Sequence, residues 1–372
     1  MRTFQFANLL RPHILTLSPY SSARDEYTGK EGVFLDANEN PLGSALRAST
    51  TSPGQYNRYP DPYQSAIKER LAPIKGVRPG QIFLGNGSDE PIDLLIRATC
   101  TPGQTDSILI LPPTYGMYEV SATINDVRLI KVPLTPDFHL DVEAVIAAIE
   151  PTTKIIWLCS PNNPSGNQLD SGAIRQVIEA ATHAVVVVDE AYIDFAQGPS
   201  WTTELDRYPN LIVLQTFSKA WGLAALRLGM CFASEEIVRV LNKIKPPYNI
   251  SAPTQALGLE ALDNVAQKDA MVAEILAERA VLVEQLRPLS IVEQVYPTDA
   301  NFVLVRFTDA KAIFEYLINK QVIVRDRSKV MLCAGCLRIS VGTRPENEVL
   351  LAHLQQYANS ARLSVNADAL TH

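Results

Sequence analysis

The chain has 372 residues, and 47% of them are hydrophobic, so it is long enough for one large domain with a smaller one. A formal net charge of −7 excludes an overall basic field of the kind that attracts nucleic acid, although it leaves room for a local cationic pocket. Because no apolar run is long enough to span a bilayer and the N-terminus lacks a signal-peptide pattern, we expect a soluble, cytoplasmic protein with neither nucleic-acid nor membrane partners.

The N-terminal segment is rich in Pro, Ser, Asn and Gly and has little periodicity. It is therefore expected to be an irregular arm over residues 1–57, which contributes to the smaller domain and to a contact with a second subunit. We assign residues 58–285 to the large domain and residues 286–372 to the smaller one. A helix is expected at 63–72.

A strand, a glycine turn and a helix follow one another from residue 81. The strand at 81–84 runs into GNGSDEP (85–91), and an apolar-periodic helix comes next. The free N–H groups of Ser88, Asp89 and Glu90 at the helix start form an anion site that the glycines leave open. Simple capping by Ser88 or Asp89, without any ligand, explains the pattern equally well.

Several further strands end in polar residues, at the sheet edge where ligands bind in open α/β folds. A turn is expected at 112–118, after the strand at 107–111. Tyr115 in this turn is placed to stack on a flat heterocycle, although packing against a helix is the commoner fate of such a residue. The strand at 154–160 ends in a turn with Asn162 and Asn163. The apolar strand at 184–192 ends in adjacent acids. Burying the carboxylate of Asp189 costs free energy unless a cation or a proton donor pairs with it.

The stretch LIVLQTFSKAWGLAALR (211–227) reads as a buried strand at 211–214, a polar cluster, and a helical start after Lys219. Thr216, Ser218 and Arg227 surround this lysine with hydroxyls and a cation, which suits a phosphate. A lone lysine in such a place is ordinarily a solvated loop residue. An amine at the carboxyl end of a core strand is nevertheless a candidate nucleophile.

The repeated order of strand and helix from about residue 76 to about residue 241 predicts an α/β fold with a doubly wound, mostly parallel sheet. Helical periodicity covers 252–286. The last third reads as a smaller α+β domain, with strands at 289–296, 301–307, 321–326 and 336–342 and helices at 309–319 and 346–359.

A lysine, a buried aspartate, a stacking tyrosine, a second tyrosine at 192 and a phosphate pocket form the set that pyridoxal 5'-phosphate requires. Lys219 supplies an amine for the aldehyde of this cofactor. Asp189 supplies a carboxylate that keeps the pyridine nitrogen protonated, and the charge pairing removes the penalty of burying it.

Seven motifs together resemble, in order and spacing, the fold-type-I pyridoxal-phosphate aminotransferases, and among these most of all the histidinol-phosphate aminotransferases. The motifs are YPD (59–61), GNGSDE (85–90), PTYGMY (113–118), SPNNPSG (160–166), VVVDEAY (186–192), TFSKAWGLAALRLG (216–229) and CLRISVGTR (336–344).

The resemblance implies a role for each matching residue. Lys219 is the lysine that holds the cofactor's aldehyde, Asp189 pairs with the ring nitrogen, Tyr192 and Asn163 bond the ring oxygen, and these four form the catalytic set. The remaining cofactor contacts are Tyr115 on the ring and Ser88, Asp89, Thr216, Ser218 and Arg227 at the phosphate. Tyr59 reaches the cofactor of the neighbouring subunit, which implies a homodimer.

The resemblance also implies two half-reactions that carry an amino group from histidinol phosphate to 2-oxoglutarate in histidine biosynthesis. The amine of Lys219 moves the proton, and the substrate-binding residues are Tyr20, Asn38, Arg325 and Arg338. Arg344 is as well explained by a structural salt bridge. No metal site is expected, because Cys333 and Cys336 have neither a second pair nor nearby histidines.

Three alternatives remain open from the sequence. An aromatic amino-acid aminotransferase would also take a ring beside the amine, and a threonine-phosphate decarboxylase shares the architecture and a phosphorylated substrate. A cofactor-binding regulatory or structural module, without catalysis, is the alternative from another class.

Overall fold

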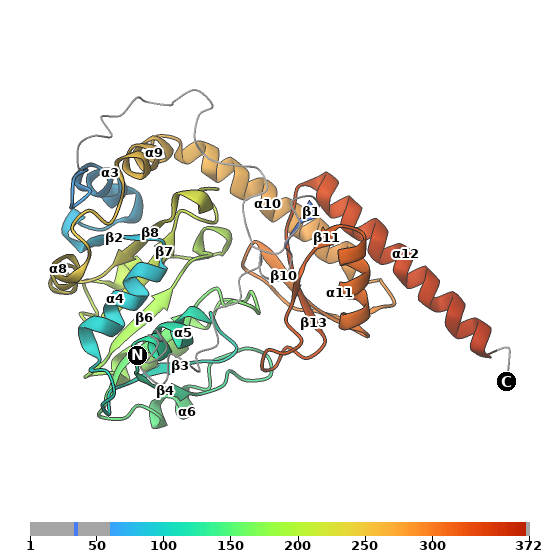
Figure 1. The fold of residues 1–372 in the computed structure, drawn as a ribbon, viewed down its shortest axis with the longest axis horizontal. Helices are drawn as coiled ribbons and strands as arrows, with labels where there is room; N and C mark the ends of the chain where they lie inside the picture. Colours follow the sequence, from blue (N-terminus) through green and yellow to red (C-terminus); the bar gives the residue numbers. More distant parts are fainter. Residues whose placement is uncertain (1–32, 36–59, 370–372) are drawn as a thin grey trace, which may run out of the picture.

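A seven-stranded sheet forms the larger part of the protein in this computed structural model, which describes residues 33–35 and 60–369 (Figure 1). Its strands lie in the order β2-β8-β7-β6-β5-β3-β4. Their bounds are β2 (Ile82–Asn86), β3 (Ser107–Ile110), β4 (Arg128–Lys131), β5 (Thr153–Cys159), β6 (Val185–Asp189), β7 (Leu211–Thr216) and β8 (Leu228–Phe232).

The strands of this sheet are parallel from β7 through β6, β5 and β3 to β4. Among the described strands of the sheet, β8 alone runs in the opposite direction to the others. It pairs antiparallel with β2 on one side and with β7 on the other. Sheets of this kind are buried on both faces, which is why their strands read as continuous apolar runs. The prediction of an α/β fold with a doubly wound, mostly parallel sheet is confirmed.

Helices cover both faces of the sheet, and the alternation of side chains along each strand separates two cores. In β6, Val186 and Val188 join the core under α3 (Ser65–Lys75), α6 (Val142–Ala147) and α7 (Ser171–Ala180). Val187, between them, joins the core under α4 (Asp89–Thr99), α5 (Met117–Ile124) and α8 (Glu235–Ile244). A side chain at position 189 therefore faces the same helices as Val187.

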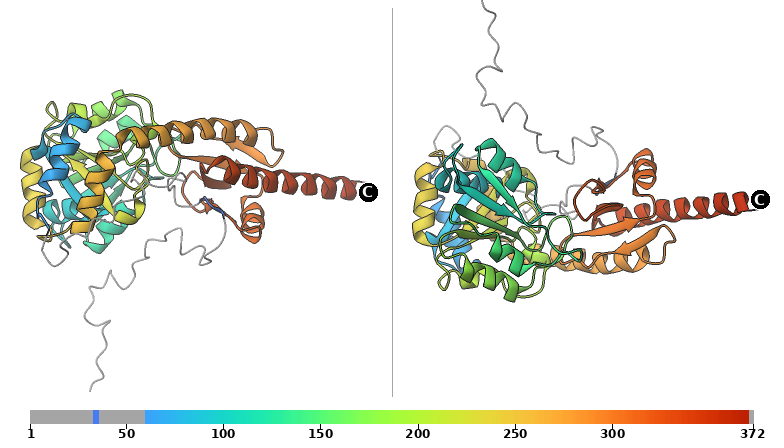
Figure 2. Two further views of the ribbon diagram at one scale, coloured as in Figure 1. Left: turned by 90° about the horizontal axis from the view of Figure 1, so that it is seen from above. Right: turned by 90° about the horizontal axis from the view of Figure 1, so that it is seen from below.

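A smaller antiparallel sheet in the order β12-β13-β10-β9 has its own core. Its strands are β9 (Val292–Val295), β10 (Phe302–Phe307), β12 (Arg325–Asp326) and β13 (Cys336–Ser340), and its helices are α10 (Val265–Leu286), α11 (Ala310–Asn319) and α12 (Arg344–Ala369). Figures 1 and 2 show α10 running from the side of the large sheet to the smaller one, beside α12. The short strand β1 (Val33–Phe34) pairs in parallel with β11 (Val322–Ile323), which ties the N-terminal segment to this part.

Three local expectations differ from the structure. After Lys219 the chain does not start an α-helix: Gly222 and Arg227 take left-handed backbone conformations, and between them lies one 3-10 turn, η5 (Ala224–Leu226), before β8. The expected turn at 112–118 already contains the start of α5. The helical stretch 252–286 is two helices, α9 (Ala252–Leu262) and α10, with a break at Asp263 and Asn264.

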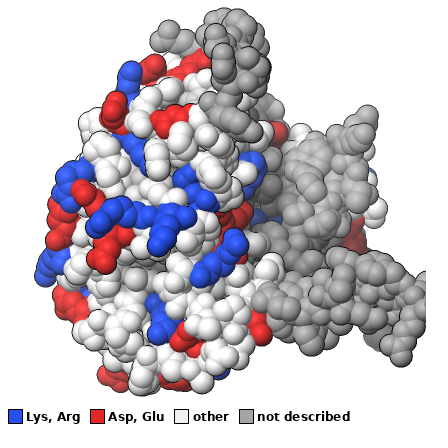
Figure 3. All heavy atoms as spheres, turned by 60° about the vertical axis from the view of Figure 1, so that its left-hand side comes forward, with Lys and Arg blue, Asp and Glu red and all other residues white. Residues whose placement is uncertain are grey.

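The surface drawn in Figure 3 carries basic side chains interspersed with acidic ones. That mixture is typical of a soluble surface and differs from a continuous basic face. Among the described residues, no helix is long and apolar enough to cross a membrane. All five cysteines are buried with free thiols, as expected for reduced core residues.

Candidate active site

The carboxyl ends of β5, β6 and β7, which are neighbours in the large sheet, bring three of the predicted residues to one edge. Asn163 lies in the turn after β5, Asp189 is the last residue of β6, and Lys219 follows β7 in the loop toward β8. Parallel strands end at the same edge of a sheet, so these side chains come from segments far apart in the sequence.

Asp189 is buried, with 2% of its surface exposed, and it accepts two hydrogen bonds. The hydroxyl of Tyr118, on α5, donates to Oδ2 at 2.6 Å, and the backbone N–H of Ala191 donates to Oδ1 at 3.2 Å. Burial raises the pKa of Asp189 to about 6, although both hydrogen bonds act to lower it. A cation beside this carboxylate would lower its pKa further.

Lys219 lies beside Tyr192, a buried residue just past the end of β6. The Lys219 Nζ is 5.8 Å from the centre of the Tyr192 ring, and that ring stands edge-on to Phe302 of the smaller sheet, 5.2 Å between centres. The backbone of Lys219 is held in a tight turn, because its carbonyl accepts from the N–H of Gly222 at 3.0 Å. The amine is thus positioned between the two sheets.

The glycine turn after β2 packs directly on β8. A Cβ atom on Gly229 would lie 2.3 Å from the backbone of both Gly87 and Ser88, so only glycine fits there. The N–H of Gly87, with φ of +73°, donates to the carbonyl of Arg227 at 2.7 Å. This contact places the first turn of α4, with its unpaired N–H groups, beside the Arg227 loop.

Two groups of polar side chains come from the start of α4 and from the segment between β7 and β8. Asp89 accepts from the Tyr115 hydroxyl at 2.9 Å and contacts Arg227 Nη2 at 3.4 Å. The Thr216 hydroxyl donates to Ser218 Oγ at 2.9 Å, with both residues buried. The helix N-terminus, the hydroxyls and a guanidinium together suit a phosphate group.

Two buried arginines face the site from the smaller sheet. Arg325 in β12 and Arg338 in β13 are direct cross-strand partners, 3% and 5% exposed respectively. Guanidinium groups bind carboxylates and phosphates through paired hydrogen bonds, so two neighbouring arginines suit an anionic ligand. Arg338 Nη1 donates to Asn163 Oδ1 at 2.5 Å, and its guanidinium lies over the Phe302 ring at 5.2 Å.

The turn that carries Asn163 is fastened at both of its ends. Asn162, which is fully buried, donates from Nδ2 to the Pro113 carbonyl at 2.9 Å. On the other side the N–H of Asp299 donates to the Gly166 carbonyl at 2.7 Å, and Asp299 Oδ2 accepts from the N–H of Gln168 at 2.8 Å. Of Asn162 and Asn163, which the sequence analysis named together, Asn162 therefore holds the turn in place.

A cavity of about 470 Å³ opens next to Tyr115 and Asn163. Its far wall comes from the loop between β12 and β13, with Arg327 and Lys329, and Lys131 lines it from β4. Lys131 forms an ion pair with Glu119 at 2.7 Å. Glu119 also lines the cavity, so the charged residues of its walls are three cations and one carboxylate.

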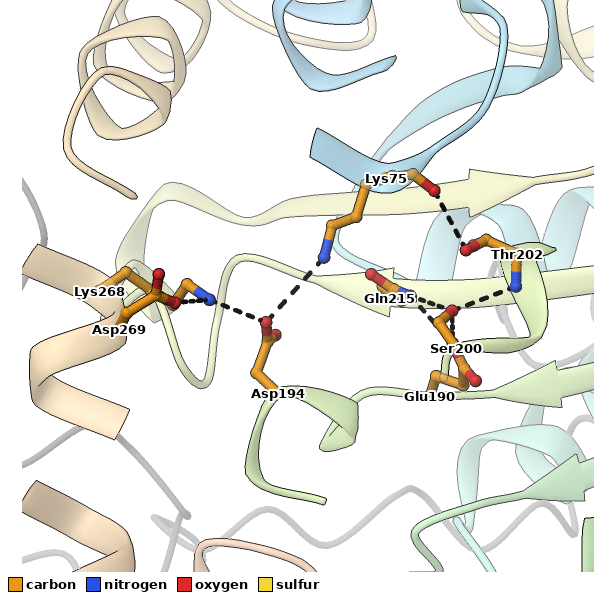
Figure 4. A network of polar contacts seen from close by, with 8 residues as sticks. All are labelled: Lys75, Glu190, Asp194, Ser200, Thr202, Gln215, Lys268 and Asp269. Atoms are coloured by element: carbon orange, nitrogen blue, oxygen red, sulfur yellow. Dashed lines mark hydrogen bonds and ion pairs between the residues drawn. The ribbon is translucent and has the colours of Figure 1, made fainter. Parts of the chain in front are cut away.

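A buried carboxylate, Glu190, and a half-buried one, Asp194, lie just beyond the site (Figure 4). Glu190 accepts hydrogen bonds from Ser200 Oγ, the N–H of Trp201 and Gln215 Nε2, and burial raises its pKa to about 7. Asp194 lies between Lys75 and Lys268, at 4.0 and 3.2 Å. These lysines lower its pKa against the opposing effect of burial.

Arg344 forms a salt bridge with the buried Glu278 of α10 at 3.0 Å, so its structural explanation is confirmed. In the part of the chain that the structure describes, no group of three or more His, Cys, Asp or Glu residues could hold a metal ion.

The predicted residues Tyr20, Asn38 and Tyr59 lie outside the described residues. The sequence analysis missed Tyr118 and Gly229. Tyr118 is the last residue of the expected turn, and only recognition of α5 could have placed its ring over β5 and β6. Gly229 closes the motif at 216–229, and a glycine inside a strand often marks a close backbone approach.

Comparisons with known proteins extend this description. The model of the family aminotransferase class I and II matches residues 30–354. The chain is 58% identical over 354 residues to a histidinol-phosphate aminotransferase of Cytophaga hutchinsonii, covering 95% of this chain and 99% of the relative. It is 53% identical over 344 residues to one of Parabacteroides distasonis, covering 92% and 96%.

Solved structures show the same fold. The histidinol-phosphate aminotransferase of Sinorhizobium meliloti, in complex with pyridoxal 5'-phosphate, superposes with a TM-score of 0.84 at 24% identity, covering 95% of this chain and 98% of the other. The enzyme of the same name from Clostridium acetobutylicum gives a TM-score of 0.79 at 22% identity, covering 88% and 99%.

Proposed function

Because the chain belongs to the class I and II aminotransferases, we propose that it transfers the amino group of histidinol phosphate to 2-oxoglutarate in L-histidine biosynthesis. The observation that carries this substrate is the pair of buried arginines, Arg325 and Arg338, one hydrogen bond away from Asn163. The names of relatives more than 50% identical over nearly the whole chain support the same choice.

The residues at the sheet edge fit pyridoxal 5'-phosphate. The carboxylate of Asp189 is buried with a raised pKa, so a pyridinium nitrogen would relieve its desolvation. Lys219 would hold the aldehyde, and Tyr192 and Asn163 the ring oxygen. Tyr115 would lie on the ring. The phosphate would be held by the N–H groups of Ser88 and Asp89, by Thr216 or Ser218, and by Arg227.

When bound, the cofactor supplies an aldehyde that takes up the substrate amine and a ring that accepts an electron pair. Lys219 Nζ would take the proton from the substrate carbon that bears the amino group and deliver it to the aldehyde carbon of the cofactor. In the second half-reaction it would move a proton in the opposite direction. Asp189 holds a positive charge at the ring nitrogen. The keto product leaves before 2-oxoglutarate enters, so the two half-reactions share one site.

The arginine pair explains how one site accepts two substrates. A phosphate and a carboxylate both accept paired hydrogen bonds from a guanidinium. Arg325 and Arg338 would bind the phosphate of histidinol phosphate in one half-reaction and a carboxylate of 2-oxoglutarate in the other. Tyr20 and Asn38 are proposed to complete the substrate site from the N-terminal arm.

The proposal includes a homodimer, in which Tyr59 reaches the cofactor phosphate of the second subunit, and a cytoplasmic location. It also includes the division into an arm (1–57), a large cofactor-binding domain (58–285) and a smaller domain (286–372). The strands of the smaller sheet begin after α10, at Val292, although Val272, Ile275 and Leu282 of α10 already pack in the core of the smaller sheet.

A panel of amino donors tests the substrate. With 2-oxoglutarate as acceptor, we expect kcat/KM for histidinol phosphate to exceed that for phenylalanine or tyrosine by about 100-fold or more, because leaving a buried charged group without its partner costs roughly 2 to 5 kcal/mol. Glutamate formation is the readout. The control is Arg325→Gln, which should lower kcat/KM for histidinol phosphate far more than for phenylalanine.

Two outcomes would overturn the assignment. A preference for phenylalanine or tyrosine would indicate an aromatic amino-acid aminotransferase. Release of carbon dioxide from threonine phosphate would indicate a decarboxylase.

A further inference from the structure

Tyr118 is the feature of the site that no motif role explains. It lies in α5, its surface is fully buried, and its hydroxyl makes a 2.6 Å hydrogen bond to Oδ2 of Asp189. This bond joins two residues that are 71 positions apart in the sequence.

The ring of Tyr118 is held on two sides. It stacks on Trp157 of β5, with 4.7 Å between ring centres and 14° between planes, and it meets Tyr115 edge-on at 5.6 Å. Trp157 is opposite Val187 in the sheet, and Asp189 is on the same face two residues further on. The hydroxyl is thereby directed at the carboxylate by packing that does not depend on the hydrogen bond itself.

We propose that Tyr118 is a positioning residue for the cofactor: its O–H holds Asp189 ionised and aimed, so that the carboxylate meets the ring nitrogen. A carboxylate oxygen that already accepts a buried O–H stays charged more readily, and the second oxygen is oriented by the Ala191 N–H. The inference rests on the proposed cofactor site.

The titratable groups around Asp189 define what the pH test must consider. Cys159 faces it from β5 and Asp89 from the start of α4, besides Tyr118 from α5. Burial raises the pKa of Asp189, and the Tyr118 hydrogen bond opposes that rise. Removing the hydroxyl therefore moves the pKa of Asp189 up.

Tyr118→Phe is the direct variant, because it keeps the ring and its stacking and removes only the O–H. The chain offers a matched control in Tyr208→Phe. The hydroxyl of Tyr208, also a buried residue, donates to Glu179 Oε1 at 2.8 Å, and Tyr208 precedes β7 at the opposite edge of the sheet. Both variants lose one bond between a tyrosine and a carboxylate.

The first measurement is the dissociation constant of pyridoxal 5'-phosphate from the cofactor-free protein, between pH 5 and 8. Relative to wild type we expect Tyr118→Phe to weaken binding by about 10-fold or more, the scale of a hydrogen bond to a charged group. The midpoint of the pH dependence should move to higher pH. In the loaded enzyme kcat should fall with little change in KM for the amino donor, whereas Tyr208→Phe should match wild type in each property.

A double-mutant cycle completes the test. In an Asp189→Asn background, Tyr118→Phe should have no further effect on cofactor affinity. Equal affinities and equal pH midpoints for Tyr118→Phe and Tyr208→Phe would overturn the proposal. So would loss of the cooperative urea transition in Tyr118→Phe alone, since the hydroxyl would then serve folding. Failure of the wild-type protein to bind the cofactor would instead refute the proposed function.

Discussion

Arg338 on the smaller sheet donates from Nη1 to Oδ1 of Asn163 on the large sheet at 2.5 Å. The hydrogen bond connects a residue proposed to bind substrate with one proposed to bind the cofactor ring. Asn163 must direct its amide oxygen at the arginine, which leaves its NH₂ group as the donor to a ring oxygen. The state of the arginine pair is thus linked to the orientation of Asn163.

Replacing Arg338 by glutamine should lower kcat/KM for histidinol phosphate and for 2-oxoglutarate alike, by about 100-fold or more, because truncating a buried charged partner costs roughly 2 to 5 kcal/mol. The control is Arg306→Gln, an arginine of the same sheet that lies over the Tyr296 ring at 5.5 Å. Single-turnover rates for the two half-reactions measure the effect. Equal losses in the two variants would contradict the role of Arg338.

Gly229→Ala should weaken pyridoxal 5'-phosphate binding strongly, because the new Cβ would lie 2.3 Å from the backbone of the Gly87 turn. The turn must move away from β8 and take the start of α4 with it. Gly80→Ala is the control, since its Cβ would approach only the end of the exposed Glu235 side chain at 3.1 Å. Titration of the cofactor-free proteins should show the loss for Gly229→Ala alone.

Glu190→Gln should stabilise the cofactor-free protein above pH 7. Burial raises the pKa of Glu190 to about 7, so the native state binds a proton more tightly than the unfolded chain. Stability due to this group is present below the unfolded pKa of about 4.3 and is lost as pH rises to about 7, on the order of 3 kcal/mol in total.

In Glu190→Gln, the new side-chain amide would find a hydrogen-bond acceptor nearby. Gln215 Oε1 has no hydrogen-bond partner among the described residues, and a flip of the Gln215 amide would let this oxygen accept from the new NH₂ group. Urea unfolding at pH 5, 6, 7 and 8 should therefore show a flatter pH dependence for Glu190→Gln. An unchanged slope would show that Glu190 does not titrate in this range.

Asp194→Asn should destabilise the protein by about 3 to 5 kcal/mol at pH 7, because it removes the carboxylate shared by Lys75 and Lys268, whose side chains are only 11% and 12% exposed. The same Lys268 also contacts Asp269 at 2.6 Å, but the Asp269 side chain is 62% exposed. Asp269→Asn is therefore a matched control, expected to cost less than about 1 kcal/mol.

The effect of Asp194→Asn should also depend on pH. Because the lysines lower the pKa of Asp194, its contribution is present above the unfolded pKa of about 3.9 and disappears as pH falls through the lower native value. Wild type and Asp194→Asn should therefore converge in stability once the pH has fallen below the lowered native pKa of Asp194. A constant difference at every pH would indicate lost packing instead of lost charge pairing.

Much of the site could be read from the sequence, because its residues follow apolar runs that can only be buried strands. Asn163, Asp189 and Lys219 each come at such a strand end, and parallel strands bring these ends together. The need of Asp189 for a proton donor also followed from its position.

The identity of that donor could not be read. The helix that carries Tyr118 has only eight residues and starts after a Pro- and Gly-rich turn, so its periodicity is too short to recognise. The helix expected after Lys219 was wrong for a related reason. LAAL favours a helix, but the left-handed backbone at Gly222 and Arg227 and the pairing of β8 with β7 prevail over that local preference.

The hydrogen bonds between Asp299 and the Asn163 turn bear on the absorption spectrum of the cofactor-loaded protein. Gly166 and Gln168 both form hydrogen bonds with Asp299, just before β10, so we expect a small displacement of the smaller sheet to move the turn as well. An unreactive anion that binds Arg325 and Arg338 would then alter the hydrogen bond to the cofactor ring without any amino transfer. The absorption spectrum of the cofactor-loaded protein would therefore report whether an anion occupies the pair Arg325 and Arg338, although that anion does not touch the cofactor.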